Sequence, residues 1–220
     1  MELNQIEAYI DSPNPQERIK AITELRKYTP SVVVPLLKRR MYDQEFIIRS
    51  FVAMGLGSKQ TDEAFQALVN LIEYEKDTNV RAEAANSLAK YGERAYPHLM
   101  QLFEQDSNWL VRYSILAALP GTDAPEIVLQ LCLWGIAGEN TFIQKASIAN
   151  LEKLQRTSQA EEALEILLSL AKIEEPEIRA QVARALGYFE QPKAKAALVE
   201  MQQDQDYRVV GAILERLLQN

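Results

Sequence analysis

Cysteine and histidine are almost absent from this sequence of 220 residues, which contains one of each, Cys132 and His98. A single cysteine excludes an intramolecular disulfide and any zinc or iron–sulfur site built from several cysteines of one chain. A single histidine excludes a metal site with several histidines and catalysis that needs a second histidine. We expect His98 to be solvated or to satisfy a helix end. Cys132 lies in the apolar segment IVLQLCLWGIA without a basic neighbour, so we expect a buried, inert thiol.

Long apolar runs, basic clusters and glycine-rich loops are also missing. No apolar stretch approaches the ~20 residues of a membrane-spanning helix, and the first residues do not resemble a secretory signal. The 31 acidic residues outnumber the 24 basic ones and no basic run exceeds Lys38-Arg39-Arg40, which argues against nucleic acid as a partner. No phosphate-binding loop, metal motif or convincing acid–base pair of carboxylates occurs. We expect a soluble, cytoplasmic protein that has no metal or cofactor and is non-catalytic or at most weakly catalytic.

What the sequence does contain is a pattern that repeats about every 31 residues. In VRAEAANSLAKYG, residues 80–92, Arg81 is followed at spacings of three, four and seven by Ala84, Ala85 and Leu88. Positions with this spacing share one face of an α-helix, so each copy predicts a helix with one buried stripe. The first positions of the copies are Arg18, Arg49, Arg81, Arg112, Gln144, Arg179 and Val210, at intervals of 31, 32, 31, 32, 35 and 31 residues.

A second helical pattern precedes each copy and is clearest in FQALVNLIEYE, residues 65–75. Each repeat therefore predicts a hairpin of two helices. Pro35 and Pro97, two periods apart, are expected in the first turn of the first helices. The acids expected at or near the N-caps of the second helices are Asp43, Asp77, Asp106 and Asp206.

Short loops and the lack of a linker predict a single domain of residues 1–220. Hairpins of this kind bury their apolar stripes by stacking on one another, so the expected fold class is all-α, a right-handed α-solenoid of about seven hairpins. The repeats are expected at approximately 1–28, 29–58, 59–91, 92–120, 121–156, 157–190 and 191–220.

The repeat D-x-x-V-R-x-x-A-A-x-x-L-x-x-Y-G, as in residues 77–92, resembles a HEAT repeat. Its short, alanine-rich form is similar to the repeats of cyanobacterial phycobilin lyases of the E/F type and their relatives, over essentially the whole chain. The resemblance implies association with phycobiliproteins, by attaching bilins, removing them during phycobilisome degradation or exchanging them. Other relatives are adaptors, one type of which partners an iron–sulfur assembly scaffold. The motif consists of packing residues and does not choose among these functions.

The repeated arginine could belong to a basic ladder that grips propionates or phosphates, but its position favours a structural role. In HEAT-like stacks an arginine here bonds the acidic cap residue and the loop carbonyls of adjacent repeats, which satisfies groups that would otherwise be buried without partners. The residues of this structural ladder are Arg18, Arg49, Arg81, Arg112 and Arg179.

Positions one, two and five after the arginine lie on the exposed side of the second helix, which lines the concave face of such solenoids. Aromatic residues and methionine are enriched where protein surfaces bind one another. The candidate partner-binding residues of the concave surface are Phe51, Met54, Glu83, Asn86, Trp109, Tyr113, Lys145 and Arg184. The alternative that Phe51 and Trp109 pack between helices stays open, because periodicity does not separate a groove from a core.

These observations lead to three hypotheses of function. The first is a protein-binding scaffold or adaptor whose concave groove holds another protein, such as a phycobiliprotein or an assembly factor. The second is a bilin lyase or bilin-detaching factor, in which Lys145 and Arg184 contact the propionates, a bilin is bound and Cys132 could accept it. The third is an adaptor for iron–sulfur cofactor assembly.

Overall fold

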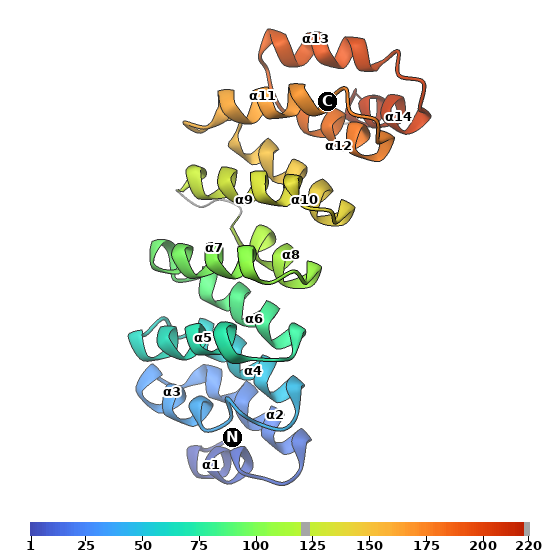
Figure 1. The fold of residues 1–220 in the computed structure, drawn as a ribbon. Coiled ribbons are helices and arrows are strands. Elements are labelled where there is room, and N and C mark those ends of the chain that lie inside the picture. The colour runs from blue at the N-terminus through green and yellow to red at the C-terminus, as the bar shows by residue number, and fades with distance from the viewer. Residues whose placement is uncertain (120–123, 218–220) are drawn as a thin grey trace. The chain divides into compact units, whose positions relative to one another are not determined.

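The computed structural model describes residues 1–119 and 124–217, which form fourteen α-helices and no strand (Figure 1). The all-α fold predicted from the helical spacing is confirmed. The chain divides into two compact units, Met1–Ala118 and Leu119–Asn220, and each is described by itself. The single domain expected from the short loops stays a prediction.

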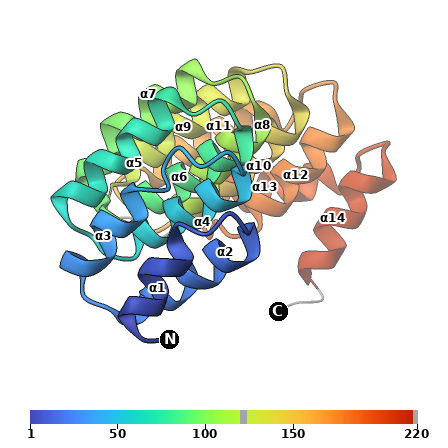
Figure 2. The same ribbon diagram turned by 90° about the horizontal axis from the view of Figure 1, so that it is seen from below.

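Unit 1 contains four helical hairpins, whose helices form two layers. The first helices are α1 (Leu3–Ile10), α3 (Pro30–Lys38), α5 (Asp62–Tyr74) and α7 (Tyr96–Gln105). The second helices are α2 (Pro15–Glu24), α4 (Phe46–Gly57), α6 (Thr78–Ala89) and α8 (Trp109–Ala118). Each second helix packs against the next, from α2 to α8, and α5 packs against α3 and α7. Figure 2 shows α3, α5 and α7 along one side of this unit.

Unit 2 contains three hairpins built in the same way. Its first helices are α9 (Pro125–Ala137), α11 (Ala160–Leu170) and α13 (Pro192–Met201), and its second helices are α10 (Thr141–Leu151), α12 (Pro176–Leu186) and α14 (Tyr207–Leu217). Helix α12 packs against both α10 and α14. The two units thus contain the seven predicted hairpins.

The repeated positions form the core, as their spacing predicts. In the six copies that start between Arg18 and Arg179, the residues three, four and seven positions further on are at most 5% exposed. The seventh copy differs, because Leu214 is 53% exposed while Ile213 is buried. Helix α14 is the last described helix and packs on α12 and α13, so the side that a further repeat would cover stays open. The side chain of Leu217 lies outside the described residues.

The two matched prolines take different places in their helices. Pro97 is the second residue of α7, as predicted for a first-turn proline. The same prediction is wrong for Pro35, which lies inside α3. That helix begins earlier, at Pro30, whose fixed φ suits the first helical position. Pro35 therefore removes one backbone hydrogen bond from α3.

A close contact between glycine and serine draws α4 and α6 together. A Cβ atom added at Gly57 of α4 would lie 2.6 Å from the Cβ atom of Ser87 in α6. Ser87 is fully buried. Glycine is therefore needed at position 57 because only its hydrogen fits beside the neighbouring helix, and the contact fixes how closely the second helices approach.

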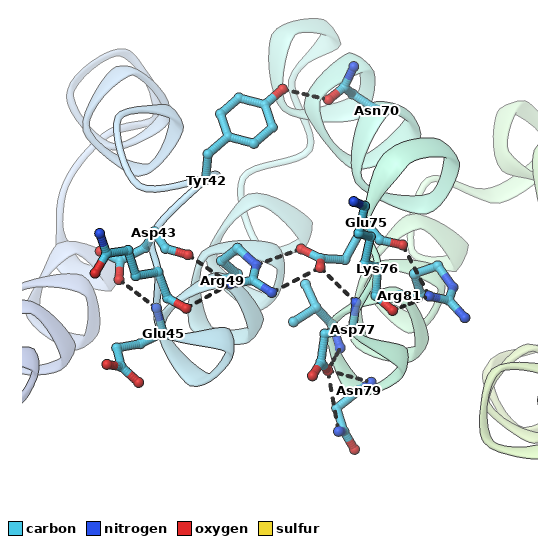
Figure 3. A network of polar contacts seen from close by, with 12 residues as sticks. Tyr42, Asp43, Glu45, Arg49, Asn70, Glu75, Lys76, Asp77, Asn79 and Arg81 are labelled. Carbon is cyan, nitrogen blue, oxygen red and sulfur yellow. Dashed lines mark hydrogen bonds and ion pairs between the residues drawn. The ribbon is translucent and has the colours of Figure 1, made fainter.

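The arginine that begins a copy ties the loop of its own hairpin to the loop of the next one. Nη1 of Arg49 donates hydrogen bonds to the carbonyl oxygens of Asp43, at 2.7 Å, and Gln44, at 3.3 Å, in the loop before α4. Nε and Nη2 donate to the two carboxylate oxygens of Glu75 at 2.6 and 2.9 Å, in the loop before α6. Figure 3 shows Arg49 between Asp43 and Glu75.

The same contacts recur in both units. The paired residues are Arg18–Asp43, Arg49–Glu75, Arg81–Asp106 and Arg179–Asp204, with N–O distances between 2.6 and 2.9 Å. Each of these arginines also donates to the carbonyl oxygens of the residues five and six positions before it. Arg112 donates to the carbonyl oxygens of Phe103 and Asp106 at 3.0 and 2.8 Å. All five arginines of the predicted ladder therefore donate hydrogen bonds to backbone carbonyls of the loop that precedes their own helix.

The acid of each pair organises its own loop as well. The carboxylates of Asp43, Glu75, Asp106 and Asp204 accept hydrogen bonds from the backbone N–H two residues further on, at 2.8 to 3.1 Å. Where another arginine follows, as for Glu75 and Arg81, the backbone carbonyl of the acid accepts from it. One acidic residue thus joins the arginine of the preceding repeat to the arginine of its own repeat.

A different position caps the second helix, four residues before the first residue of each copy. Asp77 accepts from the backbone N–H groups of Asn79 and Val80 at the start of α6, and Asp206 accepts from that of Arg208 in α14. Of the acids expected at or near the caps, these two are the capping residues. Asp43 and Asp106 lie two positions further from their helices and bind arginines instead.

Two of the ladder carboxylates, those of Glu75 and Asp204, have a pKa below the ordinary value although both side chains are largely buried. Burial pushes the pKa of Glu75 up, but hydrogen bonds from Arg49 and from the backbone N–H of Asp77 outweigh it, so this pKa lies below its ordinary value. The hydrogen bonds from Arg179 lower the pKa of Asp204 against the opposing effect of burial. Both ion pairs are therefore intact at neutral pH.

We predict that Arg49→Ala destabilises the protein by roughly 2–4 kcal/mol, because it leaves a buried carboxylate and two loop carbonyls without their donor. The side chain of Glu75 is only 7% exposed. Urea unfolding followed by circular dichroism measures the loss. Arg184→Ala is the matched control, since Arg184 and Glu215 are 43% and 62% exposed and such pairs contribute about 0–1 kcal/mol. Equal losses in the two variants would contradict the structural role of Arg49.

We also predict that Asp204 makes stability fall on acidification. Its lowered pKa in the folded chain means that it stabilises the fold above the ordinary unfolded value of about 3.9 and that this contribution is lost as pH falls through the lowered folded value. Urea midpoints between pH 7 and pH 2.5 should therefore fall less steeply for Asp204→Asn than for the unaltered chain. Parallel pH profiles would rule out this contribution.

Candidate protein-binding surface

The outward side chains of α4, α6 and α8 form one continuous surface, here termed the second-helix face of unit 1. Three large apolar residues of this face are well exposed, Met54 at 47%, Trp109 at 48% and Tyr113 at 40%. Phe51 is half-buried. Of the two side chains whose place periodicity left open, Trp109 thus belongs to the surface, whereas Phe51 lies between surface and core.

Two residues of this face were missed in the sequence analysis. Phe46 and Ile47 are the first residues of α4 and are 45% and 40% exposed. They stand one helical turn before Ser50 and Phe51 and therefore continue the same surface toward the helix start. Their spacing to the predicted positions was the signal that could have identified them.

The middle of the face is formed by α6, which packs between α4 and α8. Its outward side chains are polar. Glu83 and Asn86 are half-buried there, and Oε1 of Glu83 accepts a hydrogen bond from Ser87 Oγ at 3.1 Å. Ala82 was expected to be exposed and is 5% exposed. The equivalent alanine of α12, Ala180, is buried too, as is Ala212 of α14, one position further along its copy. These short side chains are covered where neighbouring second helices meet.

The corresponding face of unit 2 is crossed by ion pairs, and Phe142 of α10 and Tyr207 of α14 are 46% and 83% exposed beside them. Lys145 of α10 contacts Glu177 of α12 at 3.0 Å, and Glu177 contacts Arg208 of α14 at 3.4 Å. Arg184 of α12 contacts Glu215 of α14 at 3.2 Å. The hydrogen bond from Lys145 holds the pKa of Glu177 below its ordinary value. Both basic residues predicted to bind a partner are thus already paired with glutamates.

The predicted site residues therefore fall into two groups. Phe51, Met54, Glu83, Asn86, Trp109 and Tyr113 share the second-helix face of unit 1, whereas Lys145 and Arg184 belong to unit 2. The apolar part of the candidate site is in unit 1 and the basic part in unit 2.

His98 and Cys132 are both placed in packed surroundings. The His98 ring is half-buried in α7 and meets the ring of Phe65 edge to face, with centroids 5.6 Å apart. Cys132 in α9 is fully buried, and this burial raises the pKa of its thiol to about 12. A thiol held in its protonated form is a poor nucleophile at neutral pH.

Within residues 1–119 and 124–217, no three His, Cys, Asp or Glu residues are grouped in a way that could hold a metal ion. None of the helices described in this part of the chain is both long and apolar enough to cross a membrane.

Comparison with known proteins agrees with this architecture. A family model described as HEAT repeats matches residues 33–120 and 130–218. The fold is similar to that of YibA from Escherichia coli, with a TM-score of 0.62 at 16% identity over 96% of this chain and 80% of that chain. It is also similar to the complex of CpcE and CpcF of phycocyanin lyase from Nostoc sp. PCC7120, with a TM-score of 0.55 at 19% identity over 100% of this chain and 94% of that chain.

No curated protein sequence matches the chain. The two structural likenesses show a shared fold, at identities too low to transfer an activity. The family match extends over most of the chain and coincides with the helical hairpins described above. This chain belongs to the HEAT-repeat family.

Proposed function

We propose that the protein is a non-catalytic scaffold that binds a partner protein on the second-helix face of unit 1. The observation that carries this proposal is the exposure of Met54, Trp109 and Tyr113 on helices that pack side by side. Apolar area stabilises a complex by roughly 25 cal/mol per Å² when it is removed from water. Large aromatic residues and methionine are also the side chains that dominate the buried centres of interfaces.

The polar residues of α6 give this surface its specificity. Glu83 and Asn86 lie between the apolar groups of α4 and α8, so a bound partner would cover them. A partner that offers no hydrogen-bond donor to Glu83 would bury a charged carboxylate that has the hydroxyl of Ser87 as its donor within the described residues, at considerable cost. The partner that fits is therefore a protein with apolar anchors on both sides of a donor group.

The partner that we favour is a phycobiliprotein, with an assembly factor as the alternative. Support comes from the alanine-rich repeat and from the likeness to the CpcE–CpcF complex of phycocyanin lyase. A scaffold of this kind would hold a phycobiliprotein subunit by shape and apolar contact along the second helices, with no chemical step on this chain.

A second candidate is a bilin lyase or bilin-detaching factor, favoured by the same likeness. Two features of unit 2 weigh against it. Bilin propionates would have to displace Glu177 from Lys145 and Glu215 from Arg184. The one thiol of the chain is buried and protonated, so Cys132 is unsuited to accept a bilin. The adaptor for iron–sulfur assembly stays a hypothesis based on the sequence resemblance alone.

The scaffold proposal predicts that Met54→Ala, Trp109→Ala and Tyr113→Ala together weaken partner binding at least about tenfold to a hundredfold, as for central interface residues. The partner is first captured from the source cells with the unaltered chain and identified by mass spectrometry. Its affinity is then measured by calorimetry, with circular dichroism to verify that helicity is retained.

The matched control is Tyr42→Ala with Tyr74→Ala, because these tyrosines are 75% and 70% exposed but lie after α3 and at the end of α5, away from the second helices. The control should bind like the unaltered chain. Unchanged affinity of the triple variant would exclude the second-helix face of unit 1 as the binding surface.

For the lyase alternative we expect that phycocyanobilin forms no covalent adduct with the folded chain at pH 7.5, since the pKa of the Cys132 thiol is raised to about 12 by burial. Intact-mass measurement checks for the adduct, with Cys132→Ser as control, and a difference spectrum checks for non-covalent binding. A Cys132 adduct, or a saturable absorbance change without one, would contradict the scaffold proposal and favour a bilin-handling protein.

A further inference from the structure

The arginine ladder is interrupted in the first hairpin of unit 2, where both members of a pair are replaced. Gln144 stands where five other copies have arginine, and Ile173 stands six residues before Arg179, where the loops before α4, α6, α8 and α14 place an acid. The side chain of glutamine is shorter than that of arginine, and the side chain of isoleucine cannot accept a hydrogen bond. The bond between these neighbouring loops is therefore missing at this position.

The loop carbonyls show the same difference. Gln144 Nε2 donates to the carbonyl oxygens of Ile136 and Gly138 at 3.3 and 2.7 Å. Arg18, Arg49, Arg81 and Arg179 reach the carbonyl oxygens five and six positions before them, as Arg179 does with Glu174 and Ile173 at 2.8 Å each. Gly138 is six positions before Gln144, so Gln144 keeps this contact, but it donates no hydrogen bond to the carbonyl oxygen of Glu139, five positions before it. The second loop contact of a ladder arginine is thus missing at Glu139.

A cavity of about 250 Å³ lies at this interruption, entirely within unit 2. The apolar residues that line it are Ile136, Ile148, Leu170, Ile173 and Ile178. Ile148 and Ile178 are buried. An alkyl chain of three or four carbons would bury its surface against these side chains and gain roughly 0.8 kcal/mol for each methylene group.

The charged side chains that line the cavity are both acidic, beside the neutral Thr141 and Gln144. Glu139 and Glu175 both line it and both are exposed to solvent. Within the described residues, neither side chain forms a hydrogen bond or an ion pair, in contrast to the glutamates that lie across the face of α10, α12 and α14. Two carboxylates next to an apolar wall favour a ligand with an alkyl stem and a cationic head.

We propose that this cavity receives an arginine side chain of a protein partner, which takes the place that arginine of this chain occupies in the other repeats. The stem would lie against the isoleucines, and the guanidinium would donate to Glu139 and Glu175. The ladder itself is the template for this assignment, since Arg49, Arg81 and Arg179 show how a guanidinium is held between two such loops. The site is separate from the second-helix face of unit 1, so either proposal can fail alone.

The probe for this site is n-propylguanidinium, which reproduces the arginine side chain from Cβ outward. It is titrated into the full ¹⁵N-labelled chain while backbone amide shifts are followed. We expect saturable shifts around residues 139, 144, 173 and 175, with a dissociation constant of roughly 1–10 mM for so small a ligand. The neutral isostere n-propylurea should bind at least fivefold more weakly.

Two variants test the assignment further. Glu139→Gln with Glu175→Gln should weaken n-propylguanidinium binding severalfold, whereas Glu161→Gln with Glu200→Gln removes the same charge from α11 and α13 and should not. Gln144→Arg with Ile173→Asp places an arginine and an acid of this chain at the two ladder positions. This variant should no longer bind n-propylguanidinium.

Absence of saturable shifts near residue 144, equal binding of n-propylurea, or unchanged binding to the glutamine double variant Glu139→Gln with Glu175→Gln would each overturn the proposal.

Discussion

The hydrogen-bonded ion pair between an arginine and the acid of the following loop is the interaction on which the rest of this structure depends. Hairpins with one apolar stripe can slide along one another, because hydrophobic contact has no direction. The guanidinium removes that freedom, since its fixed fork of donors must meet two carbonyls of one loop and a carboxylate of the next. Arg49, between Asp43 and Glu75, shows both contacts in one side chain.

Because the arginine–acid bonds lie in the loops, the outward side chains of the second helices are not needed to join the repeats. The residues three, four and seven positions after the arginine form the core, and the arginine joins the loops. The positions between them are free to differ, and they do. Unit 1 has Met54, Trp109 and Tyr113 there, whereas unit 2 has the ion pairs of Lys145 and Arg184. One stacking scheme thus presents two surfaces of different chemistry.

The fold could be predicted from the sequence because its main determinant is periodic. A spacing of three, four and seven defines a helix face wherever it occurs, and repetition of the pattern averages out local exceptions. The exceptions arise where a residue depends on neighbours that the pattern does not contain. Leu214 is exposed because no described helix packs on the outer side of α14, and Pro35 lies inside α3 because Pro30 starts that helix earlier.

The partners of the ladder and part of the surface were harder to predict. The arginine was expected to meet acids and carbonyls of adjacent loops, but its acid lies about 25 residues away in sequence, in a loop whose conformation periodicity does not describe. Acids six and four residues before the arginine look alike in sequence, although Asp106 binds Arg81 and Asp77 caps α6. Phe46 and Ile47 were missed because they precede the repeated frame. A partner is not readable at all, since exposed side chains describe only one half of an interface.

The arginine–acid bond also limits the number of residues that can lie between its two partners. In every pair the acid follows its arginine by 25 or 26 residues. A guanidinium cannot stretch, so residues inserted between the two would pull the next loop out of reach. Successive copies that start with arginine are 31 or 32 residues apart, whereas the copy that starts with Gln144 is followed after 35. The longest interval is the one in which both members of the pair are replaced, by Gln144 and Ile173, so extra residues are tolerated where neither side chain constrains the loop.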